Sequence, residues 1–181
     1  LLTDTVQNST NPLNAGQVIR VEGAGPVSMK NGATDYALQA VNWNDGMDKK
    51  NWNICFVTTG YDHIKLSSKQ QGGGTNGGPK DFKLQYKITG TGTWADVPGG
   101  TIILDNDWTT GVILNLDLPA ECQNQSNLVY IRWIMASNTD IKGGLVTAAG
   151  VSKIDDIIIT GMPITAVPDR ETAAGLYTSP N

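Results

Sequence analysis

Short runs in which apolar and polar residues alternate dominate this chain, and helical periodicity is almost absent. The clearest run is 81–89, where every second residue is apolar and the residues between them are mostly Lys and Gln. Alternation with a period of two indicates a strand with one face in the core and one in water. The run 128–135 is apolar at both sets of positions apart from Arg132, which predicts a central strand.

Runs of this kind recur about every ten residues and are bounded by Gly, Asn, Asp and Pro. We therefore predict an all-β fold, an antiparallel jelly-roll β-sandwich of about eight to ten strands. The predicted strands are 17–22, 36–41, 51–58, 63–71, 81–89, 101–104, 111–118, 128–137 and 153–160. Two Gly-rich stretches, 70–80 and 138–150, are predicted loops. The first has too few side chains to form a core, so we expect it to be exposed or clamped by a ligand.

The sandwich is expected to cover residues 1–162. Residues 163–181 contain Pro and Thr without alternation, which predicts a linker or the start of a following module. The chain begins at Leu1 with no initiator Met and no signal peptide, so we expect it to be part of a longer protein with neighbouring domains. No run approaches the roughly 20 apolar residues of a transmembrane helix, which argues against membrane insertion.

Composition narrows the possible partners and the compartment. The 13 Lys and Arg residues against 17 Asp and Glu give a net charge of −4 and a pI of about 4.8. Nucleic-acid binders are usually basic, so we expect no nucleic-acid partner. Charged residues make up only 17% and Gly reaches 21 residues, which favours an extracellular or cell-surface module. Cys55, in an apolar run, and Cys122, in a polar loop, are expected to be free thiols, with Cys55 buried.

Several segments, taken in order, resemble a jelly-roll module that recurs in large secreted and cell-surface proteins of bacteria. These segments are 59–70, 77–86, 93–97, 129–134 and 152–161, and the resemblance spans residues 33–161. The tail 173–180 is similar to the opening of the immunoglobulin-like domains that often follow such modules. The resemblance implies a galactose-binding-like β-sandwich that serves as a carbohydrate-binding or adhesive accessory module in a multidomain protein.

The residues argue against catalysis. A glycosidase needs two carboxylates about 5–9 Å apart, yet most Asp residues here lie in Asn/Asp/Gly turns, where they cap their own backbone. The single histidine, His63, directly follows a Gly-Tyr-Asp turn and is more simply an ordinary half-exposed side chain. We predict that the protein is not an enzyme.

Sugar binding needs a flat apolar ring beside hydrogen-bonding groups, and the chain has five Trp but only two Phe. Trp133 lies in an apolar strand and is predicted to be core, and Trp94 is predicted to cover a hairpin. The other three lie among Asn and Asp and form a candidate loop site, although Trp is usually buried and each could be a structural anchor. The residues of this site are Trp43, Asn42, Asp45, Trp52 and Trp108, with Trp43 first.

The water-facing side of the sheet is a second candidate surface. Lys83, Gln85 and Lys87 share one side of their strand, and Arg132 adds a guanidinium. Lys69 lies in a similar row with Lys65 and Ser67, if 63–71 is one continuous strand. Such a row on a concave sheet would hold hydroxyls or an acidic sugar, while the simpler interpretation is solvated charge. Loss of Lys83 and Gln85 would distinguish the two surfaces, since only the sheet site needs them.

A structural calcium ion is a further hypothesis, because secreted β-sandwiches often use one and Ca²⁺ prefers carboxylate and carbonyl oxygens. Asp155 and Asp156 are adjacent in a strand, so only one of them can face the core, where it needs a cation or N–H donors. Glu22 and Asp45 are the candidate co-ligands. The alternative is that the two aspartates bond to Lys153, Arg132 or nearby backbone.

These observations favour a non-catalytic module that binds extracellular polysaccharide and tethers a larger secreted or surface protein to it. The alternative is a structural or adhesive spacer without glycan binding.

Overall fold

The computed structural model describes residues 19–164, and these form two antiparallel sheets of five strands each. The prediction of an all-β jelly-roll sandwich is confirmed. The strands are β1 (Arg20–Glu22), β2 (Val27–Asn31), β3 (Tyr36–Ala40), β4 (Asn51–Phe56), β5 (Tyr61–Gly73), β6 (Asp81–Ile88), β7 (Ala95–Ile103), β8 (Gly111–Asp117), β9 (Val129–Met135) and β10 (Val151–Pro163), with one 3-10 turn, η1 (Ala120–Cys122). Among the described residues, no helix is long and apolar enough to cross a membrane.

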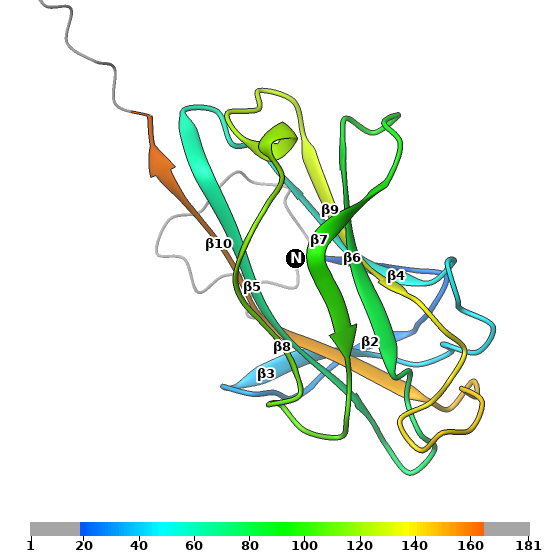
Figure 1. Ribbon diagram of the computed structural model, residues 1–181. Coiled ribbons are helices and arrows are strands. Elements are labelled where there is room, and N and C mark those ends of the chain that lie inside the picture. The colour runs from blue at the N-terminus through cyan, green and yellow to red at the C-terminus, as the bar shows by residue number, and fades with distance from the viewer. Residues whose placement is uncertain (1–18, 165–181) are drawn as a thin grey trace, which may run out of the picture.

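The first sheet has the strand order β1-β4-β9-β6-β7, and the second has the order β2-β3-β10-β5-β8. Figure 1 shows the two layers, with the long strands β5 and β10 running side by side through the second. Strand β2 was not predicted from the sequence, because this short edge strand has apolar side chains only at Val27 and Met29. The expected boundary at residue 162 falls inside β10. Residues 1–18, and 165–181 of the expected linker, lie outside the described part of the chain.

Three tryptophans form the centre of the core between the sheets. Trp43, Trp52 and Trp133 are all fully buried, and the ring of Trp43 packs 5.6 Å from those of Trp52 and Phe82. Buried indole N–H groups need acceptors. Trp52 of β4 donates to the hydroxyl of Ser152 on β10, and Trp133 of β9 donates to that of Ser68 on β5. Hydrogen bonds thus join the two sheets through the core.

The first Gly-rich segment is exposed only at residues 74–76 and is buried on either side of them, which corrects part of the sequence-based expectation. β5 continues to Gly73, and Gly77, Gly78 and Pro79 are buried. A Cβ on Gly78 would collide with the carbonyl oxygen of Val151, so two backbones lie in direct contact here. The second Gly-rich loop closes over this segment, because the Ile141 N–H donates to the Gly78 carbonyl. The protein's own second Gly-rich loop thus holds the buried part of this segment.

Both cysteines are free, as predicted, but Cys55 is only half-buried because it occupies an outward position of β4. Cys122 is buried, and this burial raises the pKa of its thiol to about 12. The Cys122 thiol is therefore protonated and unreactive at neutral pH.

We expect Gly78→Ala to lower the free energy of unfolding by about 3 kcal/mol, because the added methyl group overpacks a backbone contact. Gly90→Ala is the matched control, since the nearest atom to a Cβ there is the Tyr130 hydroxyl at 3.6 Å. Its effect should be about 0.5 kcal/mol or less. Urea unfolding measures both variants, and equal stability of the two would contradict the packing interpretation.

Candidate functional site

The predicted loop site does not form, because its two main indoles lie inside the protein. Trp43 and Trp52 have no exposed surface, and the Trp43 N–H donates to the carbonyl of Ala40, 2.9 Å away. Asn42 and Asp45 are exposed in the same loop, at φ of 60° and 51°, where they form turns. The Asn42 side chain donates to the Gly25 carbonyl. The polar residues next to Trp43 belong to the β3–β4 loop, from which the Trp43 indole points inward. Trp52 points inward from strand β4.

Trp108 is partly exposed, in the loop that connects edge strand β7 of the first sheet to edge strand β8 of the second. Asp107 shapes this loop. Its carboxylate accepts hydrogen bonds from the backbone N–H groups of Thr109 and Thr110 and from the Thr110 hydroxyl. These bonds, first those from the Thr110 and Thr109 backbones, lower the pKa of Asp107 to about 2. The Asp residues beside Trp108 thus build a turn.

Lys69 lies on the opposite sheet from the other residues of the predicted row. It projects from β5 and forms an ion pair of 2.9 Å with Asp156 of β10. The continuous strand that was expected for 63–71 does form, but it belongs to the second sheet. Lys69 is therefore not part of one surface with Lys83, Gln85 and Arg132, which corrects the predicted set.

The remaining three predicted residues come together on the outward side of the first sheet, here called the polar face. In the register of the sheet Gln85 of β6 lies between Arg132 of β9 and Asp96 of β7. The Gln85 carbonyl accepts hydrogen bonds from Nε and Nη2 of Arg132, at 2.8 and 2.5 Å. Its amide donates to Asp96, and Lys83 pairs with the same carboxylate at 3.3 Å. These four side chains form one hydrogen-bonded network.

Two aromatic rings lie beside this network, and the sequence analysis assigned neither of them to a site. Trp94, at the hairpin between β6 and β7, has the Arg132 guanidinium 4.1 Å and the Lys87 ammonium 4.8 Å from its ring centre. Lys87 also lies 5.1 Å from the ring centre of Tyr130. Trp94 was expected to pack on its hairpin, and both rings are partly exposed. The sequence contained one indication of this arrangement. Tyr130 and Arg132 are two residues apart, and residues at that spacing lie on the same side of a strand.

The charges of the polar face are held in their ionised forms. Burial lowers the pKa of Arg132, while the carboxylates of Glu22, Asp48 and Asp96 act in the opposite direction. Arginine stays charged at neutral pH even so. The pKa of Asp96 is lowered, chiefly by the hydrogen bond from Gln85 and then by the hydrogen bond and charge of Lys83. The network is therefore intact at neutral pH and is lost only as the pH falls below the ordinary 3.8 of an aspartate.

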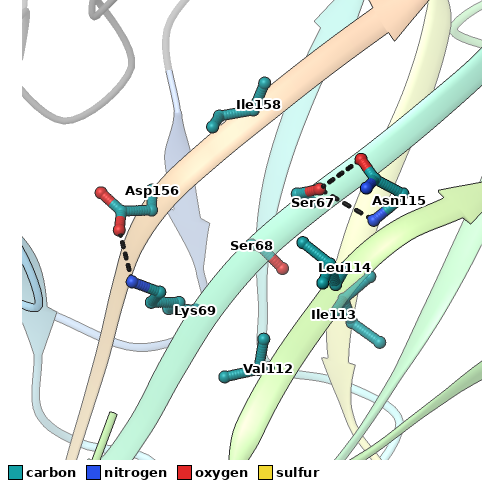
Figure 2. A pocket seen from close by; sticks show the side chains of 9 residues that line it. All are labelled: Ser67, Ser68, Lys69, Val112, Ile113, Leu114, Asn115, Asp156 and Ile158. Atoms are coloured by element: carbon teal, nitrogen blue, oxygen red, sulfur yellow. Dashed lines mark hydrogen bonds and ion pairs between the residues drawn. The ribbon is translucent and has the colours of Figure 1, made fainter. Parts of the chain in front are cut away.

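A pocket of about 260 Å³ lies on the other side of the molecule, over β5, β8 and β10. Figure 2 shows its wall, in which Val112, Leu114 and Ile158 are aliphatic and Lys69 and Asp156 form an ion pair at one side. Ser67 and Asn115 are bonded to each other within it. Among the described residues no aromatic ring lines this pocket, so their side chains do not offer the flat apolar surface against which a pyranose packs.

The four predicted calcium ligands do not form one cluster. Glu22 lies on β1 of the first sheet, Asp45 is exposed in the β3–β4 loop, and Asp155 and Asp156 lie on β10 of the second. Within residues 19–164, no group of three or more His, Cys, Asp or Glu side chains is placed to hold a metal ion. Asp156 bonds to Lys69 and to the Thr34 hydroxyl.

Asp155 is the buried member of the pair, and backbone groups satisfy it. Its carboxylate accepts hydrogen bonds from the N–H groups of Ala33, Thr34 and Asp156, at 2.7, 3.4 and 2.8 Å. A Cβ on Gly32 would collide with the same carboxylate, so this turn requires glycine. The alternative of bonding to nearby backbone therefore accounts for the burial of Asp155, and the calcium ion stays a prediction.

No protein-family model and no curated protein sequence matches the chain. Solved structures match its fold. A CBM4 structure superposes with a TM-score of 0.50 at 16% identity, covering 80% of this chain and 86% of that one. The CBM22-1 xylan-binding domain of Xyn10C from Paenibacillus barcinonensis gives 0.47 at 13% identity, covering 83% and 88%. The family 11 carbohydrate-binding module of cellulosomal cellulase Lic26A-Cel5E from Clostridium thermocellum gives 0.44 at 16%, covering 81% and 88%.

The chain has the jelly-roll fold of carbohydrate-binding modules. The CBM4 structure carries this conclusion, and at 16% identity the likeness concerns the fold. The predicted resemblance to a jelly-roll accessory module of this kind is confirmed at that level.

We expect the Asp107 carboxyl to titrate at about pH 2, because its hydrogen bonds to Thr109 and Thr110 favour the charged form. Carboxyl ¹³C chemical shifts followed by NMR from neutral to acidic pH measure this value. Asp105, the other acidic residue of the same loop, provides an internal comparison. Titration of Asp107 near the ordinary 3.8 would contradict the turn geometry.

We expect Asp155→Asn to lower the free energy of unfolding by about 1–3 kcal/mol, because an amide group would face backbone N–H donors. Asp156→Asn should lower the free energy of unfolding by less, because Asp156 is only half-buried. Tm measured with and without a calcium chelator separates the two explanations of Asp155. A chelator effect present in the wild type and absent from Asp155→Asn would assign a metal to this carboxylate, and identical Tm values would leave only the backbone role.

Proposed function

We propose that this chain is a non-catalytic carbohydrate-binding module that holds a polysaccharide on the polar face of its first sheet. The observation that carries the proposal is the arrangement around Trp94. A partly exposed indole lies beside Tyr130 and a network of guanidinium, amide, carboxylate and ammonium groups. An aromatic ring packs against the C–H face of a pyranose, and such polar groups bond to its hydroxyls.

The local chemistry of the polar face supports binding over hydrolysis. A glycosidase needs a carboxylic acid that stays protonated near neutral pH, and therefore one with a raised pKa. The pKa of Asp96 is instead lowered by its hydrogen-bond partners. The carboxylate of Glu22 accepts a hydrogen bond from the side chain of Asn51. Asp96 and Glu22 are thus each engaged by a hydrogen-bond donor of the same sheet.

Preorganisation of the site is a second support. Arg132 donates two hydrogen bonds to one Gln85 oxygen, and its guanidinium also lies over the ring of Trp94. Gln85 therefore fixes Arg132, and Arg132 in turn fixes the indole. A ligand that binds to side chains already fixed in place loses less conformational entropy on binding. The module would act in an extracellular or cell-surface protein, where it tethers neighbouring domains to the polysaccharide and gains avidity from that tethering.

We expect Trp94→Ala to weaken polysaccharide binding about tenfold or more, about 1.4 kcal/mol, because it removes the stacking surface. Isothermal titration calorimetry against soluble glucan, xylan, mannan and pectin measures the effect and does not depend on the fluorescence of Trp94. Lys83→Ala and Gln85→Ala should also weaken binding.

Leu114→Ala is the matched control, since Leu114 is 75% exposed on the opposite sheet. Each variant should keep a Tm close to that of the wild type. The absence of binding to every soluble and insoluble glycan would favour a structural spacer. Binding weakened by Leu114→Ala and not by Trp94→Ala would place the site on the other face.

A further inference from the structure

Two cations of the polar face, Lys87 and Arg132, lack a close ion-pair partner within the described residues. Of its three central cations, Lys83 is paired with Asp96 at 3.3 Å. Within residues 19–164, no carboxylate lies within 4.0 Å of the charged nitrogens of Lys87 or Arg132. The chain as a whole carries a net charge of −4, so acidic residues outnumber basic ones overall. Lys87 and Arg132 nevertheless have no carboxylate close to them among the described residues.

Lys87 has hydrogen-bonding capacity left over. Its ammonium group donates to the Gly90 carbonyl at 2.6 Å and lies over the rings of Trp94 and Tyr130, at 4.8 and 5.1 Å. An ammonium group has three N–H donors, and the carbonyl takes one of them. The two rings hold the ammonium at the edge of the site.

Arg132 also has hydrogen-bond donors left over. Its Nε and Nη2 both donate to one oxygen of Gln85, and these are the side-chain hydrogen bonds that it makes within the described residues. A guanidinium has five N–H donors in a planar fork that matches an oxyanion. Arg132 is half-buried and forms no ion pair within the described residues, although the carboxylates of Glu22, Asp48 and Asp96 act on it from farther away. An anion that reached it would form a charge-assisted hydrogen bond stronger than one to a neutral hydroxyl.

Both cations lie over the same aromatic ring, that of Trp94. Both charged groups are within 5 Å of the Trp94 ring centre, Arg132 at 4.1 Å and Lys87 at 4.8 Å. A sugar stacked on this indole would therefore have positive charge beside its ring substituents. A hydroxyl makes little use of two positive charges, whereas a carboxylate or sulfate group on the ring uses both.

We propose that the ligand is an anionic polysaccharide, whose acidic substituent binds between Lys87 and Arg132 while its ring stacks on Trp94. This proposal rests on the proposed function, because it names the ligand class of the same site. The shared chemistry is an oxyanion on a pyranose, supplied either by a uronic acid or by a sulfate ester.

The test compares glycans that share a backbone and differ in charge. Calorimetry measures the affinity for polygalacturonate against its fully methyl-esterified form, and for dextran sulfate against dextran. We expect the charged member of at least one pair to bind about tenfold tighter or more at low salt. The pair that shows the difference identifies carboxylate or sulfate as the source. The difference in affinity between the charged and the neutral glycan should become smaller between about 20 and about 500 mM NaCl, because salt screens exposed charges.

The variants assign the charge effect to this site. Lys87→Met should remove most of the preference for the charged glycan, measured as the ratio of its affinity to that of the neutral member of the same pair. Lys65→Met is the matched control, because Lys65 is a half-buried lysine on the opposite sheet, paired with Asp117 at 2.7 Å. It should keep the full preference. The salt dependence of the wild type needs no variant, so the test does not depend on the stability of Lys87→Met.

The outcomes separate this inference from the proposed function. Equal affinity for the charged and neutral members of both pairs, with binding to neutral glycans intact, overturns the anionic ligand and leaves the module assignment standing. A preference that Lys65→Met removes and Lys87→Met keeps also overturns it. No binding to any glycan, charged or neutral, overturns both.

Discussion

The indole N–H groups that cross the core are the constraint on which this structure depends. Trp52 and Trp133 belong to neighbouring strands of the first sheet and donate to Ser152 and Ser68 on neighbouring strands of the second. Each bond satisfies a buried donor only if the two sheets keep both their separation and their register. A slip of one residue in β4 or β9 would turn the indoles outward and leave the serine hydroxyls buried without these partners. The same constraint keeps Trp52 and Trp133 away from the surface, and Trp43 is fully buried against Trp52.

The fixed register of the first sheet also builds the polar face. Once Trp133 points inward, Tyr130 and Arg132 must point outward, and the pairing of β6 with β9 sets Gln85 beside Arg132 and Lys87 beside Tyr130. The hairpin between β6 and β7 then carries Trp94 to the same place. Residues from three separate segments thus meet without any of them being a recognisable motif. Their mutual hydrogen bonds hold them before any ligand arrives, which favours a shallow binding surface that needs little rearrangement.

Several carboxylates of this acidic chain hold the backbone of its turns. Asp107 holds the backbone of Thr109 and Thr110, Asp140 holds that of Lys142 and Gly144, and Asp155 holds that of Ala33 and Thr34. In each case a carboxylate satisfies N–H groups that no strand partner reaches. Net charge therefore says little about the polar face, where Lys87 and Arg132 have no carboxylate partner among the described residues. A protein with a low pI can therefore still present cations that have no ion-pair partner among its described residues.

The sequence by itself determined the fold class and most strand positions, because alternation and turn residues are local signals that each strand carries alone. It also placed Lys83, Gln85 and Arg132 on water-facing positions, since side-chain direction follows from strand parity. Only the tertiary structure decided which sheet each strand joins, and therefore that Lys69 lies on the far side from Lys83. It decided too that Trp43 and Trp52 are core despite their polar neighbours, and that Gly78 packs against another backbone. Burial and sheet membership depend on residues distant in the chain, and the alternation within a single strand contains no information about them.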